Sequence, residues 1–141
     1  MRWRVILEAV DPTGDEFRRE FEFEKDLGGL ENGEIGCSLE HGKQVMSEIQ
    51  KIVVERECEL WMEQSRVCRS CMGRLPIKDY WHRSFLTIYG PVEVRSARLK
   101  DCQRCSPWSH LTHSPLAYLC PDRATPELME IAAKLGVLPS C

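Results

Sequence analysis

Two Cys-x-x-Cys pairs constrain this 141-residue chain more than any other feature of its sequence. The first pair is Cys68 and Cys71, in "CRSC", and the second is Cys102 and Cys105, in "CQRC". Two such pairs separated by strands are typical of a zinc ribbon, in which each pair lies on a tight turn and the four thiolates form one tetrahedral site. We therefore predict a structural Zn²⁺ held by these four cysteines, which would supply folding energy to a small β-module.

Two other uses of the paired thiols have to be weighed against zinc. The same four thiolates could bind iron, and the spacing does not distinguish the two metals. A redox motif fits less well, because a thioredoxin-like pair opens a helix after a strand and neither pair does so. Three cations close to the pairs, Arg69, Lys100 and Arg104, are expected to lower the pKa of the thiols and favour the thiolate form that metals need.

Four of the eight cysteines lie outside the pairs: Cys37, Cys58, Cys120 and Cys141. Cys58 falls within a predicted helix and is interpreted as a small core residue. The roles of the other three stay open. Cys120 could join His110 and His113 in a second metal site, but the spacing is loose and no fourth ligand is evident.

Charge is distributed unevenly along the sequence. Residues 1–65 contain 8 Lys and Arg against 16 Asp and Glu, whereas residues 66–105 contain 9 against 3. The cysteine-paired segment is therefore basic, and basic side chains neutralise nucleic-acid phosphates. We predict contact with double-stranded DNA through Arg69, Arg74, Lys78, Arg83, Arg95, Arg98, Lys100 and Arg104. The alternative is a basic surface that is merely solvated.

The pattern of apolar residues predicts an α+β fold of four segments. They are an N-terminal β-hairpin with a Gly-rich loop (1–37), a long amphipathic helix (38–65), a zinc-ribbon-like β-hairpin module (66–105), and a Pro-rich link with a short C-terminal helix (106–141). The first segment alternates apolar and polar residues, as half-buried strands do. The second repeats apolar residues at helical spacing, and it is expected to pack within the protein or to pair with a second copy in a homodimer.

Local signals set the expected boundaries of these elements. Ser38 is expected to cap the long helix, because a serine hydroxyl can accept a hydrogen bond from a free backbone N–H at a helix start. Two strands, residues 83–89 and 92–100, are expected to flank a turn at Gly90, since aromatic and β-branched residues dominate both arms. The C-terminal helix is expected to follow a Thr125 cap, with proline at its first position.

Taken in this order, the motifs resemble the N-terminal region of bacterial insertion-sequence transposases of the ISKra type. In that family a Cys-x-x-Cys is followed by a Thr-x-x-Gly-x-Val-x-Val hairpin, a basic stretch, a second Cys-x-x-Cys, a Thr-Pro-Glu-Leu helix and a Leu-Pro segment. The matching residues of this chain outside the cysteine pairs are Thr87, Gly90, Val92, Val94, Arg98, Thr125 to Leu128, Leu138 and Pro139. The resemblance covers about residues 38–140 of the sequence, and the N-terminal hairpin has no counterpart in it.

The resemblance implies a zinc-bearing region that binds DNA such as transposon ends, ahead of an RNase H-like catalytic domain that uses acidic residues and divalent metal. The sequence ends at Cys141, where the resemblance places the start of that domain. We therefore expect a truncated transposase-like chain with no catalytic residues and no enzymatic activity of its own. The alternatives are a protein-interaction or regulatory zinc-ribbon module that does not bind DNA, and an iron-thiolate electron carrier.

The N-terminal sequence carries no clear export or membrane signal. Its apolar run "VILEAV" is short, is broken by Glu8 and lacks a small-residue cleavage site. No apolar run approaches the ~20 residues that a bilayer span needs. We therefore predict a cytoplasmic protein without a membrane partner, and in a reducing compartment paired cysteines favour metal binding over disulfides.

Overall fold

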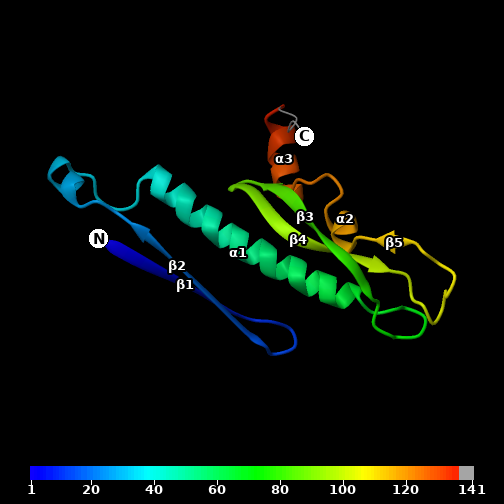
Figure 1. Cartoon of the computed structure of the whole chain (residues 1–141). Coiled ribbons are helices and arrows are strands. Elements are labelled where there is room, and N and C mark those ends of the chain that lie inside the picture. The colour runs from blue at the N-terminus through cyan, green and yellow to red at the C-terminus, as the bar shows by residue number, and fades with distance from the viewer. Residues whose placement is uncertain (137–141) are drawn as a thin grey trace. The chain divides into compact units, whose positions relative to one another are not determined.

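A computed structural model of the chain describes residues 1–136 and confirms the predicted α+β fold. The chain forms two compact units, Met1–Ile52 and Val53–Cys141, so that the boundary between them falls inside one long helix (Figure 1). Leu138, Pro139 and Cys141, which the sequence analysis singled out, lie outside the described residues.

The first unit begins with an antiparallel hairpin of β1 (Arg2–Val10) and β2 (Glu16–Glu24). Val5 lies opposite Phe21 and Trp3 opposite Phe23, so the predicted apolar positions of both strands share one face. The side chains of that face are mostly half-buried, and the glutamates of β2 are exposed on the other. Beyond β2, a single 3₁₀ turn, η1 (Gly28–Asn32), interrupts the loop that the sequence analysis expected to be irregular.

The long helix α1 (Leu39–Ser65) has the predicted length and the predicted start. The Ser38 hydroxyl accepts a hydrogen bond from the backbone N–H of His41 at 3.1 Å, which confirms the N-cap. Cys58 is buried, as expected for a small core residue. Neither α1 nor any other helix in residues 1–136 combines the length and the apolar character required to cross a membrane.

The sheet of the second unit has three antiparallel strands in the order β3 (Ile77–Thr87), β4 (Gly90–Lys100) and β5 (Thr112–His113). The predicted limits of the first strand, 83–89, were wrong at both ends. The first half of β3 lacks the apolar alternation that marks a strand, because the half-buried positions there include the charged Asp79 and Arg83, and a bulge after Ile77 shifts the register. Its last two predicted residues instead form the turn, which the Thr87 hydroxyl stabilises by donating to the Gly90 carbonyl at 2.8 Å.

The core of the second unit lies between this sheet and two helices. Cys58 of α1 packs with Phe85 and Val94 of the sheet and with Leu116 of α2 (Pro115–Leu119), a helix that the sequence analysis did not predict. A second cluster, centred on the fully buried Leu99, includes Cys68 and borders Cys71 and Cys102. The hydrophobic core therefore continues directly up to the paired cysteines.

The C-terminal helix α3 (Pro126–Lys134) is attached to the free edge of β3. The N–H of Leu86 donates to the carbonyl of Arg123 at 2.7 Å, and the N–H of Thr125 donates back to the carbonyl of Leu86 at 2.9 Å. Thr125 occupies the predicted cap position, but its side chain makes no capping hydrogen bond. The fixed backbone of Pro126 at the first helical position is the remaining start signal, as expected.

Candidate metal centre

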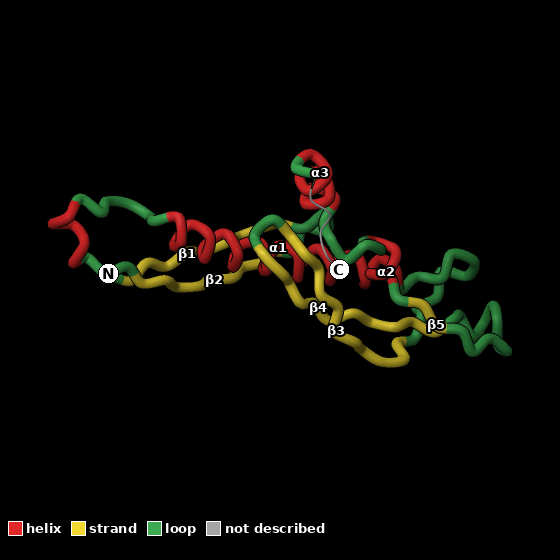
Figure 2. The backbone as a smooth tube through the Cα atoms, turned by 90° about the horizontal axis from the view of Figure 1, so that it is seen from above, coloured by secondary structure: helices red, strands yellow, loops and turns green. Residues whose placement is uncertain are grey.

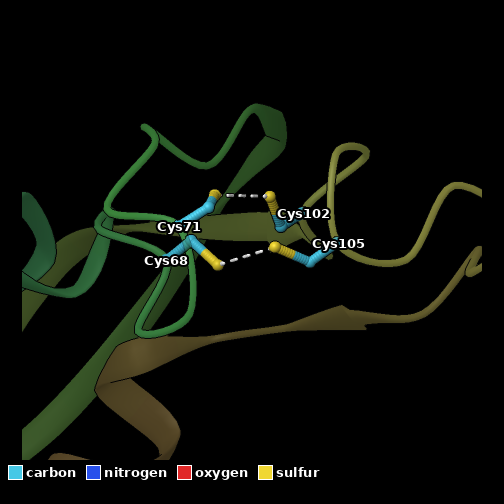
Figure 3. Close-up of side chains that lie close together, drawn as sticks. All are labelled: Cys68, Cys71, Cys102 and Cys105. Atoms are coloured by element: carbon cyan, nitrogen blue, oxygen red, sulfur yellow. Dashed lines mark hydrogen bonds between the residues drawn. The ribbon is translucent and has the colours of Figure 1, made fainter.

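The four cysteines of the two pairs converge on one point (Figure 3). The Sγ atoms of Cys71 and Cys102 are 3.5 Å apart, and those of Cys68 and Cys105 are 3.9 Å apart. All four sulfurs lie within 4.8 Å of one another. Among the described residues this is the one group of three or more potential ligands whose donor atoms come together in this way.

The spacing of the sulfurs fits a tetrahedral metal ion and does not fit disulfides. A tetrahedron with Zn–S bonds of about 2.3 Å has sulfur–sulfur edges of about 3.8 Å, which matches the observed 3.5 and 3.9 Å. A disulfide would require a separation of about 2.05 Å. The cluster could therefore hold a metal ion, and four thiolates suit zinc or iron equally well in geometry.

The first cysteine loop (67–74) is a tight hairpin. The N–H of Cys68 donates to the carbonyl of Gly73 at 2.8 Å, and the N–H of Met72 donates to the carbonyl of Cys68 at 2.9 Å. Met72 adopts a left-handed conformation with φ of +58°, which turns the chain sharply after the second cysteine. A Cβ atom at position 73 would lie 3.2 Å from the Cys71 sulfur, so glycine there leaves room for the ligand.

The second cysteine loop (101–111) is held at its base by the pairing of β4 with β5, in which Leu99 lies opposite His113. Within the loop, the N–H of Ser106 donates to the carbonyl of Cys102 at 2.8 Å, the same kind of turn as in the first loop. The N–H of Lys100 also donates to the carbonyl of Pro76, at 2.9 Å, which ties the two loops together. Figure 2 shows both loops at the end of the sheet that is far from the β3–β4 turn.

Backbone groups, more than side-chain cations, set the charge state of the thiols. The backbone N–H groups of Cys71 and Ser70 lower the pKa of Cys68 to about 6. The backbone N–H of Cys105 is the largest of the causes that lower the pKa of Cys102. The neighbouring sulfurs, that of Cys71 first, raise the pKa of Cys105 to about 12. The contribution expected from the side chains of Arg69, Lys100 and Arg104 is not among these causes, because the turns themselves supply the donors.

The second metal site that the sequence left open does not form in the part of the chain that the structure describes. His110, His113 and Cys120 do not bring their donor atoms together. His113 lies in β5 instead, and the Cys120 thiol donates to the carbonyl of Ala124 at 3.0 Å. Burial raises the pKa of the Cys120 thiol, which further disfavours a ligand role.

Four of the eight basic residues predicted to bind DNA are engaged within the protein. Arg98 forms a two-pronged ion pair with Asp79, with an Nε–Oδ1 distance of 2.6 Å. Arg74 pairs with Glu63 of α1 at 2.8 Å. The other two engaged residues are Arg83, which donates to the Cys120 carbonyl, and Arg95, which stacks over the Tyr80 ring.

The other four predicted DNA-binding residues are exposed and lie at the metal end of the second unit. Arg69 is in the first cysteine loop and Arg104 in the second, while Lys78 and Lys100 lie where β3 begins and β4 ends. None of the four has an ion-pair partner among residues 1–136. The sequence alone could not tell these four exposed cations from the four engaged arginines, because the partners of the arginines come from other parts of the chain.

No family model matches the chain, and neither does any curated protein or any solved structure. The relationship to ISKra-type transposases therefore stays a prediction based on the motifs of the sequence. The capacity to hold a metal ion follows independently from the positions of the four sulfurs.

Proposed function

We propose that the chain is a zinc-binding, DNA-binding module of a transposase-like protein, acting on double-stranded DNA such as transposon ends in the cytoplasm. The observation that carries the proposal is the position of the four exposed, unpaired cations around the four-cysteine cluster. Cations without carboxylate partners are available to neutralise phosphates. The resemblance to the N-terminal region of ISKra-type transposases supports the transposase context, and no catalytic residue is proposed in this chain.

The metal has a structural part in this proposal. Both cysteine loops carry proposed DNA-contacting side chains, Arg69 on the first and Arg104 on the second. A bound ion would join the loops and hold those side chains in a fixed arrangement, since binding free energy at such sites is also folding free energy. DNA binding is therefore expected to require the metal.

The test is a titration of a labelled DNA duplex at two salt concentrations, with the metal-loaded chain and with the same chain after chelation. The logarithm of the affinity is expected to fall with the logarithm of salt concentration, with a slope of roughly −0.9 for each phosphate contact. Chelation is expected to abolish binding. Absence of binding by the metal-loaded chain at low salt would refute the proposal.

Metal analysis of the same preparation separates zinc from iron. Zinc is d¹⁰ and gives a colourless protein, whereas iron held by four thiolates gives a coloured one. One metal ion per chain, without visible absorption, is the result expected for the proposed structural zinc site.

A second candidate function is a protein-interaction module, and a groove in the second unit favours it. The groove has a volume of about 440 Å³ and lies between α1 and the sheet, with Cys58, Met62 and Ala97 among its apolar lining residues and Glu59 and Arg95 among its charged ones. The exposed Val53 and Trp61 of α1 could serve a homodimer through residues 38–65. Sedimentation analysis would show a concentration-dependent dimer, and DNA titration would show no binding, if this candidate is correct.

A further inference from the structure

We propose that the second cysteine loop is the DNA-contacting element, with a cavity at its base that takes a backbone phosphate and the exposed Trp108 beside it that stacks on an unpaired base. This inference rests on the proposed function, and it names both the contact surface and the form of DNA preferred. The ligand it specifies is a duplex with an adjoining single-stranded segment.

The cavity has a volume of about 580 Å³, and its polar lining residues are Lys78, Lys100, Gln103, Ser109, His110 and Thr112. Five of the six bear a nitrogen or hydroxyl group that can donate a hydrogen bond to a ligand, whereas the Ser109 hydroxyl already donates to Asp101. No aspartate or glutamate lines the cavity itself. A concave site with two ammonium groups and several donors suits a phosphate, which is negatively charged and accepts hydrogen bonds through each oxygen.

The backbone around the cavity is fixed from three sides. Lys100 pairs with Thr112 in the β4–β5 ladder, and its N–H donates to the carbonyl of Pro76. The Ser109 hydroxyl donates to the Asp101 carboxylate, which anchors the loop from within. Lys100 is also two residues before Cys102, the first cysteine of the second pair. The cavity is thus part of the framework that the metal would stabilise, whereas a solvated charge run has no such framework.

Trp108 differs from the other three tryptophans of the chain. Trp3 stacks with Phe23, Trp61 donates to the Pro115 carbonyl, and Trp81 lies under the Arg98 guanidinium. Trp108 has no such contact with any described residue, and its 90% exposure is the highest of all large apolar side chains in residues 1–136. Leu111, whose carbonyl accepts a hydrogen bond from the N–H of Asp101 at the base of the same loop, is 73% exposed and lines the cavity.

The two features are adjacent along the chain, because Trp108 directly precedes Ser109, which lines the cavity. A phosphate bound in the cavity therefore leaves a neighbouring base within reach of the indole ring. In a duplex the faces of the bases are covered by stacking, and only their edges are open in the grooves. An indole can stack on a base face where the base is unpaired, and this contact tolerates any sequence.

The experiment measures binding of the metal-loaded chain to a labelled duplex and to the same duplex with a single-stranded thymidine extension. The unaltered chain is expected to bind the extended duplex about fivefold or more tightly than the plain duplex, as one base stacked on an aromatic ring would give. Trp108→Ala is expected to remove this preference and Trp108→Phe to retain it. Tyr118→Ala, at an aromatic residue of α2 with 75% exposure, is the matched control and is expected to change neither affinity.

The cavity is tested with the double variant Lys78→Ala/Lys100→Ala. It is expected to weaken binding to both DNAs and to reduce the salt slope by roughly 2, one unit for each lost phosphate contact. Lys43→Ala/Lys51→Ala removes the same charge from exposed positions of α1 and should leave the slope unchanged. Metal content and circular dichroism of each variant show whether it is folded.

The outcomes separate this inference from the proposed function. If the unaltered chain binds neither DNA, the proposed function fails and the inference fails with it. If the chain binds DNA but the Lys78→Ala/Lys100→Ala variant has the same affinity and salt slope as Lys43→Ala/Lys51→Ala, the function stands and the cavity is not the phosphate site. If the extension gives no gain in affinity, or if Trp108→Ala keeps the gain, the base contact is overturned.

Discussion

The two β-hairpins of the chain are similar in length and opposite in burial. β1 and β2 have nine residues each, and β3 and β4 have eleven. No side chain of Met1–Ile52 is buried. The hairpin of β3 and β4, in contrast, contributes seven buried residues: Phe85, Thr87, Val92, Val94, Ser96, Ala97 and Leu99.

The difference shows that an alternating pattern specifies a strand but does not specify what covers it. The β1–β2 hairpin is a two-stranded sheet, which is marginally stable by itself. Its cross-strand ion pairs, such as that of Arg4 with Glu22, are exposed and contribute little. The β3–β4 hairpin has a third strand, two covering helices and the four-cysteine cluster. We therefore expect the two hairpins to respond very differently to the same perturbation.

The largest expected difference is in the response to metal removal. Apparent binding free energies of structural zinc are about 10–16 kcal/mol in small zinc-finger peptides. Amide hydrogen exchange of β4 and β5 should therefore accelerate strongly on chelation, or in Cys71→Ser, while that of β1 and β2 should not, because Met1–Ile52 supplies no ligand. Cys37→Ser, at an exposed cysteine outside the site, is the control. Unchanged exchange in β4 after chelation would contradict the structural role of the metal.

A matched pair of leucine truncations gives the next largest contrast. Leu99 is fully buried at the centre of a core cluster, whereas Leu7 of β1 is only half-buried. Leu99→Ala is expected to lower the free energy of unfolding of the metal-loaded chain by about 2–5 kcal/mol. Leu7→Ala is expected to cost less than about 1 kcal/mol. Urea denaturation would measure both losses in free energy. Equal losses would contradict the difference in burial between Leu7 and Leu99.

The ion pair of Asp79 with Arg98 should make the second hairpin sensitive to acid. Hydrogen bonds from Arg98 hold the pKa of Asp79 below its usual value. A carboxyl with a lowered folded pKa contributes stability above its unfolded pKa of about 3.9, and this is lost as the pH falls through the folded pKa. Asp79→Asn should therefore destabilise the chain at neutral pH and reduce the stability lost below about pH 4. The effect should be smaller than that of Leu99→Ala, since the pair is about one-third exposed.

Glu22→Gln provides the comparison for this ion pair in the first hairpin. It removes the carboxylate that forms exposed cross-strand pairs with Arg4 and Arg2, and it should change the free energy of unfolding at neutral pH less than Asp79→Asn does. A larger effect of Glu22→Gln would mean that the surface ion pairs hold the first hairpin more strongly than their exposure indicates.

The smallest expected effects come from the turn glycines. Gly14 and Gly90 have φ angles of +90° and +113°, and an added Cβ atom would meet no atom within 4 Å at either position. Each Gly→Ala change should therefore cost about 1 kcal/mol through backbone strain alone. Hydrogen exchange should show the loss in β1 and β2 for Gly14→Ala, and in β3 and β4 for Gly90→Ala. A loss that spreads into the other hairpin would show that the two units unfold together.

The sequence predicted those features of the fold that carry a strong local signal. Alternation in residues 1–24, helical spacing in 39–65 and the start of α3 were all confirmed. β5 and α2 were missed because each has five residues or fewer and lies in a Pro- and Ser-rich stretch without periodicity. Elements this short form because the rest of the sheet and core are already in place.

The candidate site was predictable to a similar extent. The four candidate ligands could be identified because their spacing is itself the signal, and the structure brings their sulfurs together. Which of the surrounding cations are free and which are held in ion pairs could not be identified in this way. Whether an arginine is free depends on partners such as Asp79 and Glu63, which come from a neighbouring strand or from α1 and follow no short sequence motif.

The cysteine cluster and the β3–β4 turn lie at opposite ends of one hairpin, and this has a consequence for proteolysis. With a metal ion bound, residues 68–105 form a closed ring, in which the chain joins the strands at one end and the ion joins the loops at the other. A protease that cuts after Tyr89, which is exposed in the turn, opens this ring without releasing either fragment. The nicked protein should migrate as one species until a chelator separates its two halves.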